Sequence, residues 1–447
     1  MAPTPSKGPQ LRRVATSSYL GTTIEYYDFL LYATAAALVF SKVFFADLSP
    51  SWGTIVALAT LAVGYVARFA GAIIFGHFGD RLGRKAVLVT TMVIMGVTSG
   101  IIGLLPGSEQ IGHAAPLLLV VLRILQGLAV GGEFGGAVLM TSEHAGTKRR
   151  GLASSATAMG AATGAVLATG AMTLVAQLPE DQLLTWGWRI PFLVSFLLVG
   201  VGLYCRLRVA ESPVFLARRE EHQPAGTPIV TLLRTHPTTV LKSTCFLLGA
   251  TVGQGVFAIF VMSYAPTIGY AHSTAISAVL ISTLIGLVAT PLYASLSDRI
   301  GRRPVVAGGT IFMAALAYPA FLLINSGSVG LFMLAVAAVL VLAMTPVVAV
   351  APVMLSELFP TQIRYTGVST AYQLAHLMAG FTPLIAASLL AAVGGGTNTG
   401  LISAFVLVIS LLSTLAVWWT PETRARDLTD LKGDESRSEH PEAVPST

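Results

Sequence analysis

Apolar runs of about 20 residues alternate with short polar segments along most of this 447-residue chain. A helix needs about 20 apolar residues to cross the hydrocarbon core of a bilayer. Cutting the chain at these runs predicts twelve membrane-spanning helices. Their expected ranges are 16–40, 53–77, 86–105, 116–142, 151–177, 189–208, 240–266, 274–295, 304–325, 329–358, 365–393 and 399–420. The pattern is typical of an all-α membrane protein.

A charged segment recurs at equivalent places in the two halves of the chain. Residues 76–85 read GHFGDRLGRK and residues 294–303 read ASLSDRIGRR, each between two long apolar runs. The aspartates of the two copies, Asp80 and Asp298, are 218 positions apart. A segment repeated once per half of a hydrophobic chain indicates a transporter built from two pseudo-symmetric bundles of six helices.

The ends of the fourth and tenth helices form a second repeat. Glu143 precedes Arg150 by seven residues, and Glu357 precedes Arg364 by the same interval. A tendency of cytoplasmic loops to collect basic residues would explain the arginines, but it would not place matched acids at matched offsets. This repeat therefore supports two related halves.

A polar stretch separates the six helices of the first half from the six of the second. We expect a cytoplasmic amino-terminal tail, a first bundle, a cytoplasmic linker, a second bundle and a disordered cytoplasmic tail at residues 1–15, 16–208, 209–239, 240–420 and 421–447, respectively. A weaker echo of the repeat places Glu211-Ser212-Pro213 after the sixth helix and Pro421-Glu422-Thr423 after the twelfth.

Composition and charge exclude a soluble protein. Hydrophobic residues make up 54% of the chain and charged residues 11%, whereas soluble domains carry about 25% charged residues. With the amino terminus in the cytoplasm, 23 of the 27 Lys and Arg residues fall on the cytoplasmic side, two lie outside (Lys42 and Arg189) and two lie within helices. Because Lys and Arg favour cytoplasmic loops, we expect both termini inside.

Five charged side chains lie well inside the predicted spans, namely Glu25, Asp28, Arg68, Arg123 and Glu133. The acids of the first helix argue against a cleavable signal peptide, whose core is apolar. A charged residue that faces lipid near the bilayer centre costs roughly 2.5–3.5 kcal/mol, so all five should face the protein interior or a wet cavity. Three acids against two arginines leave one carboxyl group without a cation, and burial favours its neutral form. We expect this surplus carboxyl group to carry a coupling proton.

Alternative interpretations of these charges remain open. Glu25 and Asp28, three residues apart on one helical face, are either a proton acceptor beside a substrate partner or an ion-pair staple between helices. Arg123 suits an anionic substrate because guanidinium binds carboxylate through two parallel hydrogen bonds, but permanent pairing with Asp28 is the alternative. Arg68 and Glu133 are placed to pair with each other.

Other polar residues are candidates for contacts with a substrate. The predicted helix interiors of the second half hold no acid or base, so its candidates are neutral side chains. Together with Gln126 of the first half they are Gln254, Tyr264, Tyr372, Gln373 and His376. An imidazole titrates near neutral pH, so His376 either relays protons or is a hydrogen-bonded structural residue.

Glycines recur at four-residue spacing on two helices, as Gly127, Gly131 and Gly135 on the fourth and as Gly160 and Gly164 on the fifth. Small residues at this spacing allow helices to approach closely. Sliding helices in a moving transporter and tight static packing both fit this pattern.

Several motifs resemble the major facilitator superfamily. Residues 76–85 match the Gly-x-x-x-Asp-Arg-x-Gly-Arg-Lys/Arg loop of that superfamily throughout, and the second copy matches from Asp298 onward. Four further motifs are similar to those of the metabolite:proton symporter family, which includes shikimate, 2-oxoglutarate and proline/betaine carriers. They are Glu25-Tyr26-Tyr27-Asp28-Phe29 with Tyr32, residues 123–133, residues 186–192 and residues 357–367. The chain departs from that family at Tyr26, where Trp is usual, and at Phe69, where Pro usually follows the arginine.

This resemblance implies roles for several residues. The loop charges would form a cytoplasmic gate that bridges helix ends when the protein opens outward, although a purely topological role for the same charges is the alternative. The expected gate residues are Gly76, Asp80, Arg81, Gly83, Arg84, Glu143, Arg150, Asp298, Arg299, Arg302, Glu357 and Arg364. Proton coupling is expected at Asp28, Glu25 or Glu133, and substrate contacts at Arg123 and Tyr32 besides the neutral candidates above.

We therefore expect a proton-coupled symporter that imports a small polar metabolite by alternating access. The metabolite would be an organic acid, shikimate-like or a dicarboxylate, or a zwitterion. The protein would be a monomer in the cytoplasmic membrane of a bacterium, would bind no nucleic acid and would need no cofactor or metal.

Two other classes of function are less well supported by the sequence. A proton-driven efflux antiporter typically carries a Gly-Pro motif in its fifth helix, and here no proline occurs between Gly151 and Leu178. An intramembrane enzyme is disfavoured because Ser369 and His376, seven residues apart on one helix, would lie about 10 Å from each other.

Overall fold

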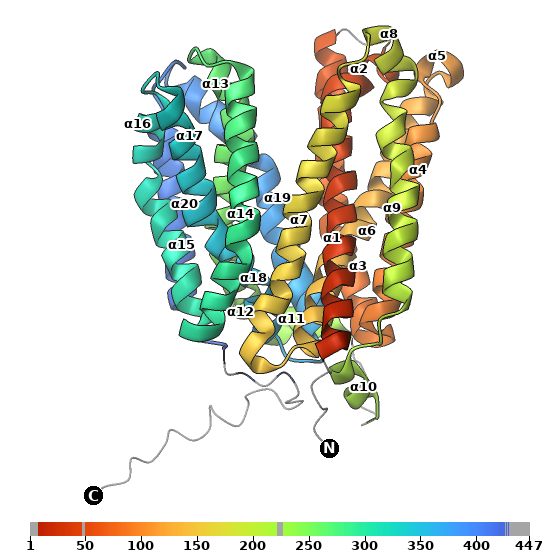
Figure 1. Cartoon of the computed structure of the whole chain (residues 1–447), viewed down its shortest axis with the longest axis vertical. Helices are drawn as coiled ribbons and strands as arrows, with labels where there is room; N and C mark the ends of the chain where they lie inside the picture. The colour runs from red at the N-terminus through yellow and green to blue at the C-terminus, as the bar shows by residue number, and fades with distance from the viewer. Residues whose placement is uncertain (1–7, 47–49, 221–226, 425, 427, 429–447) are drawn as a thin grey trace, which may run out of the picture.

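The computed structural model describes residues 8–46, 50–220, 227–424, 426 and 428. Over these residues, long helices form two bundles that stand side by side (Figure 1). The first bundle consists of α1 (Gly8–Ala35) with η1 (Ala36–Phe40), α3 (Pro50–Leu82), α4 (Arg84–Leu104), α6 (Ala114–His144), α7 (Arg150–Val175) and α9 (Arg189–Leu207). Short helical pieces connect them: α2 (Ser41–Val43), α5 (Ser108–Ile111), η2 (Thr147–Arg149), α8 (Glu180–Gln182) and η3 (Leu183–Gly187).

The second bundle repeats this arrangement, and several of its helices are divided into consecutive pieces. It consists of α12 (Pro237–Gln254) with η4 (Gly255–Phe260) and α13 (Val261–Thr267), α14 (His272–Ile300), α15 (Arg302–Leu316) with α16 (Pro319–Ile324), α17 (Val329–Ala337) with η5 (Ala338–Met344) and α18 (Thr345–Leu358), α19 (Arg364–Ala392), and α20 (Gly400–Trp418).

The twelve predicted spans correspond to these helices and helix groups. Ten helices of the described chain are long and apolar enough to cross a membrane. The other two spans are α1, which carries Glu25, Asp28 and several hydroxyl side chains, and the pair α15 and α16, which is interrupted before Pro319. The predicted all-α fold with two six-helix bundles is confirmed.

Several predicted boundaries are wrong. α1 begins at Gly8, so part of the expected amino-terminal tail is helical. The repeated charged segments are mostly helical, because they form the ends of α3 and α14. The turn into the next helix consists of one residue in each copy, Gly83 and Gly301. Their φ angles are 112° and 110°, a region that favours glycine.

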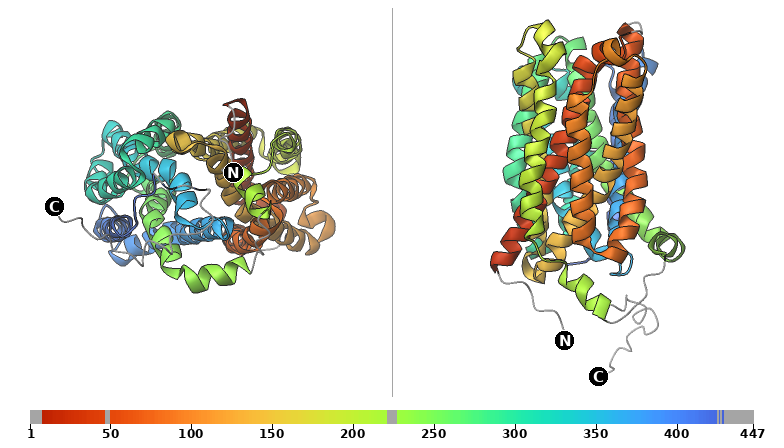
Figure 2. Two further views of the ribbon diagram at one scale, coloured as in Figure 1. Left: turned by 90° about the horizontal axis from the view of Figure 1, so that it is seen from below. Right: turned by 90° about the vertical axis from the view of Figure 1, so that its right-hand side faces the viewer.

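The linker and the carboxy-terminal tail also contain more structure than expected. The linker includes α10 (Pro213–Glu220) and α11 (Pro228–Thr235). Figure 2 shows α11 along the outside of the two bundles, where it contacts α3, α12 and α19. The first residues of the predicted disordered tail are held against the second bundle, since the Thr423 hydroxyl donates to the Glu357 carboxylate at 2.7 Å. Most of the predicted tail lies outside the described residues.

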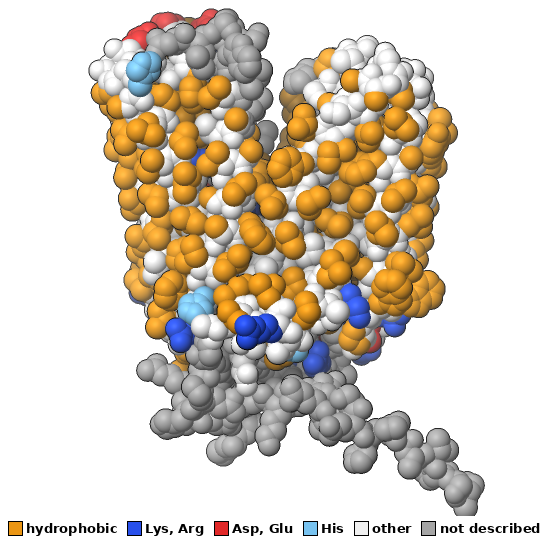
Figure 3. All heavy atoms as spheres, turned by 180° about the vertical axis from the view of Figure 1, so that it is seen from behind, with side chains coloured by type: hydrophobic (Ala, Val, Ile, Leu, Met, Phe, Trp, Pro, Cys, Tyr) orange, Lys and Arg blue, Asp and Glu red, His pale blue; other side chains and the backbone are white. Residues whose placement is uncertain are grey.

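The two bundles meet along two seams. α3 packs against α19 on one side, and α7 packs against α14 and α18 on the other. A notch separates the bundles at one end of the molecule and is closed at the other (Figure 3). We name these the open end, where α2, α8, α13 and α16 lie, and the closed end, where α10 and α11 lie. Exposed Leu, Ile, Val and Phe side chains cover the flanks between them, as expected for a surface that faces lipid.

Candidate functional site

A cavity of about 220 Å³ lies between the two bundles. Helices α1, α3, α6 and α7 of the first half and α12, η4, α14, α18 and α19 of the second contribute to its wall. Arg68 is the one Lys, Arg, Asp or Glu residue among the described residues that line it. The rest of the wall is mainly aromatic, hydroxyl and small apolar side chains. The cavity therefore presents one buried cation among neutral side chains.

Arg68 is paired but retains binding capacity. Its Nη2 lies 3.1 Å from Oε1 of Glu25, and its guanidinium stacks over the Phe29 ring at 4.7 Å from the ring centroid. Both partners of the ion pair are buried. Arg68 Nε and Glu25 Oε2 have no hydrogen-bond partner among the described residues. A ligand carboxylate that enters the cavity can therefore compete with Glu25 for this cation.

An aromatic stack forms the closed-end side of the cavity. The hydroxyl groups of Tyr26 and Tyr372 lie 3.2 Å apart and join α1 to α19. The rings of Phe134 and His376 both stack against the ring of Tyr372, with centroid distances of 3.3 Å and 4.0 Å, respectively. His376 Nδ1 also lies 2.9 Å from the Tyr372 carbonyl oxygen. The two halves therefore touch at the wall of the cavity.

Arg123 does not reach the cavity in this conformation. It is fully buried and is absent from the cavity wall. Its Nη1 donates to Oε1 of Gln126 at 2.7 Å, and its guanidinium stacks on Phe29 and Tyr32 at 4.5 Å and 4.0 Å from the ring centroids. Phe29 also faces the cavity, so its ring separates Arg123 from that space. In this conformation the arginine at the cavity wall is Arg68 and not Arg123, for which a substrate contact was expected.

Asp28 is buried within the first bundle. Its Oδ1 accepts a hydrogen bond from the Ser195 hydroxyl at 2.5 Å. The predicted alternative, a direct ion pair with Arg123, is not formed. Instead, Arg123 is hydrogen-bonded to Gln126, and Gln126 donates to Ser99 Oγ at 2.7 Å.

Glu133 pairs with Arg206, which lies in the last turn of α9. Arg206 Nη2 and Nη1 lie 2.5 Å and 2.8 Å from the two carboxylate oxygens of Glu133. The predicted pairing of Glu133 with Arg68 is wrong, because Arg206 on α9 points back into the bundle. The three buried acids Glu25, Asp28 and Glu133 are matched in number by three buried arginines, which are Arg68, Arg123 and Arg206. The prediction that one carboxyl group has no cation to balance it is therefore wrong.

The remaining polar candidates divide into two groups. Gln254, Tyr372 and His376 line the cavity. Tyr32, Tyr264 and Gln373 do not: the hydroxyl of Tyr32 donates to Thr60 at 2.8 Å, and that of Tyr264 donates to Asn325 at 2.8 Å. Gln373 is buried, and neither atom of its amide has a hydrogen-bond partner among the described residues.

At the closed end, each repeated aspartate binds the start of a helix in the opposite half. Asp80 accepts hydrogen bonds from the backbone N–H groups of residues 365–366 at 3.1 Å and 3.0 Å, at the beginning of α19. Asp298 accepts equivalent bonds from residues 151–152 at 2.9 Å and 3.0 Å, at the beginning of α7. A carboxylate at a helix N-terminus is stabilised by the free N–H groups and by the helix dipole.

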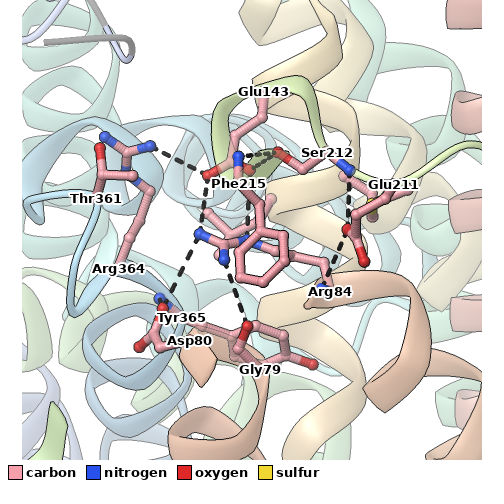
Figure 4. Close-up of polar contacts among 12 residues, drawn as sticks. Gly79, Asp80, Arg84, Glu143, Glu211, Ser212, Phe215, Thr361, Arg364 and Tyr365 are labelled. Atoms are coloured by element: carbon pink, nitrogen blue, oxygen red, sulfur yellow. Dashed lines mark hydrogen bonds and ion pairs between the residues drawn. The ribbon is translucent and has the colours of Figure 1, made fainter. Parts of the chain in front are cut away.

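Two buried glutamates tie these contacts together, and each binds one arginine from each half (Figure 4 shows the first). The four closest distances are 3.4 Å for Glu143–Arg84, 3.1 Å for Glu143–Arg364, 3.3 Å for Glu357–Arg302 and 3.0 Å for Glu357–Arg150. We call these six residues with Asp80 and Asp298 the closed-end network. Its pseudo-twofold symmetry follows the sequence repeat.

The weaker sequence echo completes this network. Glu211 accepts hydrogen bonds from the backbone N–H groups of residues 84–85 at 3.1 Å each, and Glu422 accepts them from residues 302–303 at 2.9 Å and 3.1 Å. A Cβ atom at Gly301 would lie 2.5 Å from Oε2 of Glu422, and Gly83 has the same relation to Glu211. Glycine is therefore required at both turns by the φ angle and by the carboxylate.

Three further predicted gate residues take different places. Gly76 packs against the other half, since an added Cβ would lie 2.8 Å from the Cα of Thr366. Arg81 lies with its Nη1 3.3 Å from Nε2 of His77. Arg299 is exposed and forms none of the ion pairs found among the described residues.

Sequence reasoning missed several residues of the site. Tyr65 lines the cavity and packs edge-to-face on Phe29, but nothing distinguishes it from other aromatic residues of an apolar helix. Ser195 likewise gives no signal. Arg206 had one, because it lies within the last turn of an apolar run rather than after it.

Comparisons with known proteins agree with this architecture. Residues 14–243 and again residues 230–433 match the family described as Sugar (and other) transporter. The shikimate transporter of Escherichia coli strain K12 is 37% identical over 411 residues, which cover 90% of this chain and 93% of that protein. The proline/betaine transporter of the same strain is 33% identical over 434 residues, which cover 94% of this chain and 85% of that protein.

A solved structure shares the fold. The E. coli proton:xylose symporter XylE of the major facilitator superfamily, bound to 6-bromo-6-deoxy-D-glucose, aligns with a TM-score of 0.76 at 21% identity, covering 95% of this chain and 99% of that one. Each half of the chain matches one family, and the relatives extend over nearly its whole length. The protein therefore belongs to the Sugar (and other) transporter family, is a membrane-spanning transporter, and has the fold of the major facilitator symporter XylE.

Proposed function

We propose that the protein imports a small metabolite that bears a carboxylate group, together with a proton. The observation that carries this proposal is the position of Arg68, a cavity cation whose only ionic partner among the described residues is the buried carboxylate of Glu25. A carboxylate substrate can replace that partner because guanidinium binds one carboxylate as well as another.

Replacement of the partner couples the substrate to a proton. A carboxylate buried without a cation is strongly disfavoured, so Glu25 takes up a proton when the substrate occupies Arg68. Substrate anion and proton together add no net charge to the interior, which favours movement of the loaded carrier. Loss of the proton on the other side restores the Glu25–Arg68 pair and expels the substrate.

The orientation of the protein in the membrane follows from the charges at its two ends. The exposed residues Arg81, Lys148, Arg149, Arg234 and Arg299 lie at the closed end, and basic residues favour the cytoplasmic side. We place the closed end and both termini in the cytoplasm of a bacterial cell. The present conformation is then the outward-facing one, with the closed-end network holding the cytoplasmic side shut.

The relatives support the class of substrate. Shikimate, proline and betaine each carry one carboxylate, and the transporters named for them are similar over most of this chain. The aromatic wall of Tyr26, Phe29 and Tyr65 favours a compound with a ring or a compact apolar body. A cyclic hydroxylated acid such as shikimate fits the cation, the aromatic rings and the hydroxyl groups of Thr22, Thr251 and other lining residues.

Gradient-driven uptake tests this function. Purified protein is first screened by thermal shift against organic acids, betaines and amino acids at two pH values, beginning with shikimate. In proteoliposomes, acid outside should drive accumulation of the stabilising compound. Glu25→Gln should abolish accumulation but retain binding and exchange, because a glutamine leaves Arg68 free and carries no titratable proton.

Glu109→Gln, which removes an exposed acid at the open end, is the matched control and should leave accumulation unchanged. Full accumulation by Glu25→Gln would refute this coupling mechanism. Accumulation only with the reverse gradient would instead favour the efflux antiporter.

A further inference from the structure

The Glu133–Arg206 ion pair lies beside Glu25 but outside the cavity. Gly21 and Glu25 are four residues apart on α1 and so share one helical face. A Cβ atom at Gly21 would collide with the guanidinium of Arg206 and lie 2.7 Å from Oε1 of Glu133. Glycine therefore brings this ion pair against α1, one helical turn from Glu25.

Burial of this ion pair costs desolvation free energy, so its charges need a functional explanation. Glu133 and Arg206 are 1% and 2% exposed, respectively, and the exchange at Arg68 does not involve them. A buried ion pair usually contributes little to stability, because removing both charges from water offsets their attraction. An apolar pair would join α6 to α9 equally well. The charges are better explained by their effect on a neighbouring group.

We propose that Glu133 and Arg206 are positioning residues for proton coupling, whose opposed charges set the pH at which Glu25 takes up and releases its proton. This inference rests on the proposed role of Glu25. It adds two residues, on α6 and α9, that touch neither substrate nor cavity.

The groups that face Glu25 make this pair the adjustable part of its surroundings. Arg68 from α3 binds it directly, and Tyr26 from α1 and Tyr372 from α19 are neutral at physiological pH. Among the described residues, the remaining charges that act on Glu25 are Glu133 and Arg206. At an effective dielectric constant of about 20, a unit charge roughly 8–12 Å away shifts a carboxyl titration by roughly 1–1.5 pH units.

Infrared titration of the full-length protein tests the proposal without a substrate. The carboxyl band of Glu25 is assigned by its loss in Glu25→Gln, and its midpoint is followed against pH. Glu133→Gln should lower the midpoint by roughly one unit, because the Arg206 cation then favours ionised Glu25. Arg206→Gln should raise it by a similar amount, since Glu133 then repels the ionised form.

Two variants separate charge from structure. Glu133→Gln with Arg206→Gln removes both charges and should lower the midpoint by less than Glu133→Gln alone, because Glu133 acts on Glu25 more strongly than Arg206 does. Arg206→Lys should keep the wild-type midpoint. Lys148→Gln, which removes an exposed cation, is the matched control and should produce no shift. If a single variant does not fold, an unshifted midpoint in the double variant still overturns the proposal.

The outcomes distinguish this inference from the function on which it rests. No titrating Glu25 band in the wild type would refute the coupling role of Glu25 itself. A titrating Glu25 band that both single variants leave unshifted, or shift in the same direction, would overturn only the positioning role of Glu133 and Arg206.

Discussion

Phe29 is the residue on which two arginines converge. Its ring lies 4.7 Å from the guanidinium carbon of Arg68 and 4.5 Å from that of Arg123. One cation faces the cavity and the other is sealed behind the ring. A cation over an aromatic face gains roughly 0.5–2 kcal/mol, so Phe29 stabilises both positive charges while only one is available to a substrate.

Lysine substitutions distinguish the two arginines. Arg68→Lys should weaken binding of the compound found by the screen by roughly 10–100-fold, because a lysine loses the two-pronged contact worth about 1.5–3 kcal/mol. Arg123→Lys should change affinity less than about threefold, since Arg123 does not touch the cavity. Isothermal titration calorimetry in detergent measures both. The reverse order would return the substrate role to Arg123.

At the scale of the residue, the sequence identifies the buried charged residues more reliably than it identifies their partners. Hydropathy and helical spacing identified Glu25, Arg68 and Glu133 as interior charges, because any charge within an apolar run must be buried or wet. Their pairing depends on which helix lies opposite, and a periodic pattern does not contain that information. Arg206 was missed for another reason, because its position in the last turn of an apolar run was not taken as a sign of burial.

At the scale of the element, glycines determine how closely helices cross. A Cβ atom at Gly131 of α6 would collide with the backbone oxygen of Arg68 in α3, and one at Gly164 of α7 would lie 2.9 Å from the Cβ of Tyr26 in α1. The predicted close approach is confirmed at both crossings. Sliding of the helices during transport stays a prediction.

Alanine substitutions measure this crowding. Gly131→Ala should destabilise the protein by roughly 1–3 kcal/mol, because the backbone of α3 must move to admit a methyl group. Gly170→Ala is the matched control within α7, where an added Cβ has nothing within 4 Å. It should be neutral or stabilising by up to about 1 kcal/mol, through helix propensity alone. Thermal unfolding in detergent reports both, and equal melting temperatures would contradict the packing argument.

Helix boundaries were predicted less well than helix existence. Charge in the repeated segments suggested loops, yet residues 76–82 continue α3 because Asp80 and its neighbours find buried partners in the other half. A polar residue needs a hydrogen-bonding partner. The sequence around it does not indicate whether that partner is water, as in a loop, or another protein group.

At the scale of the molecule, the closed-end network holds the two halves together through matched sets of contacts. Asp80 and Asp298 each bind a helix start across the seam, and Glu143 and Glu357 each bind an arginine from the other half. Two equivalent sets of contacts must break for the halves to separate at this end. The arrangement predicts a conformational change with few intermediate positions.

Neutralising both glutamates should shift that equilibrium. Glu143→Gln with Glu357→Gln removes a carboxylate partner from four buried arginines, of which Arg84 and Arg302 keep an aspartate at 3.9 Å and 2.6 Å, respectively, so the conformation open at this end should become more populated. Spin labels at positions 109 and 326, at the open end of each half, should then move closer in pulsed electron resonance measurements with Cys205 and Cys245 replaced by serine.

Arg299→Gln provides the control, because Arg299 contributes no ion pair to the network. It should leave the distance distribution unchanged. An unchanged distribution in the double glutamate variant would show that hydrophobic contacts alone keep this end shut.

The two sets of contacts are equivalent in geometry but not in exposure to damage. Glu211 lies in the segment that connects the two bundles, whereas Glu422 and Thr423 follow α20, the last helix among the described residues. The carbonyl of Arg426 also accepts a hydrogen bond from Arg150 at 3.0 Å. Proteolytic cleavage after residue 421 would therefore spare every membrane span and the contacts of Arg84. It would remove the Glu422 and Thr423 contacts on the Arg302 side and the Leu428 carbonyl that accepts from Arg364 at 3.3 Å, and should favour opening of the closed end in a carrier that still inserts normally.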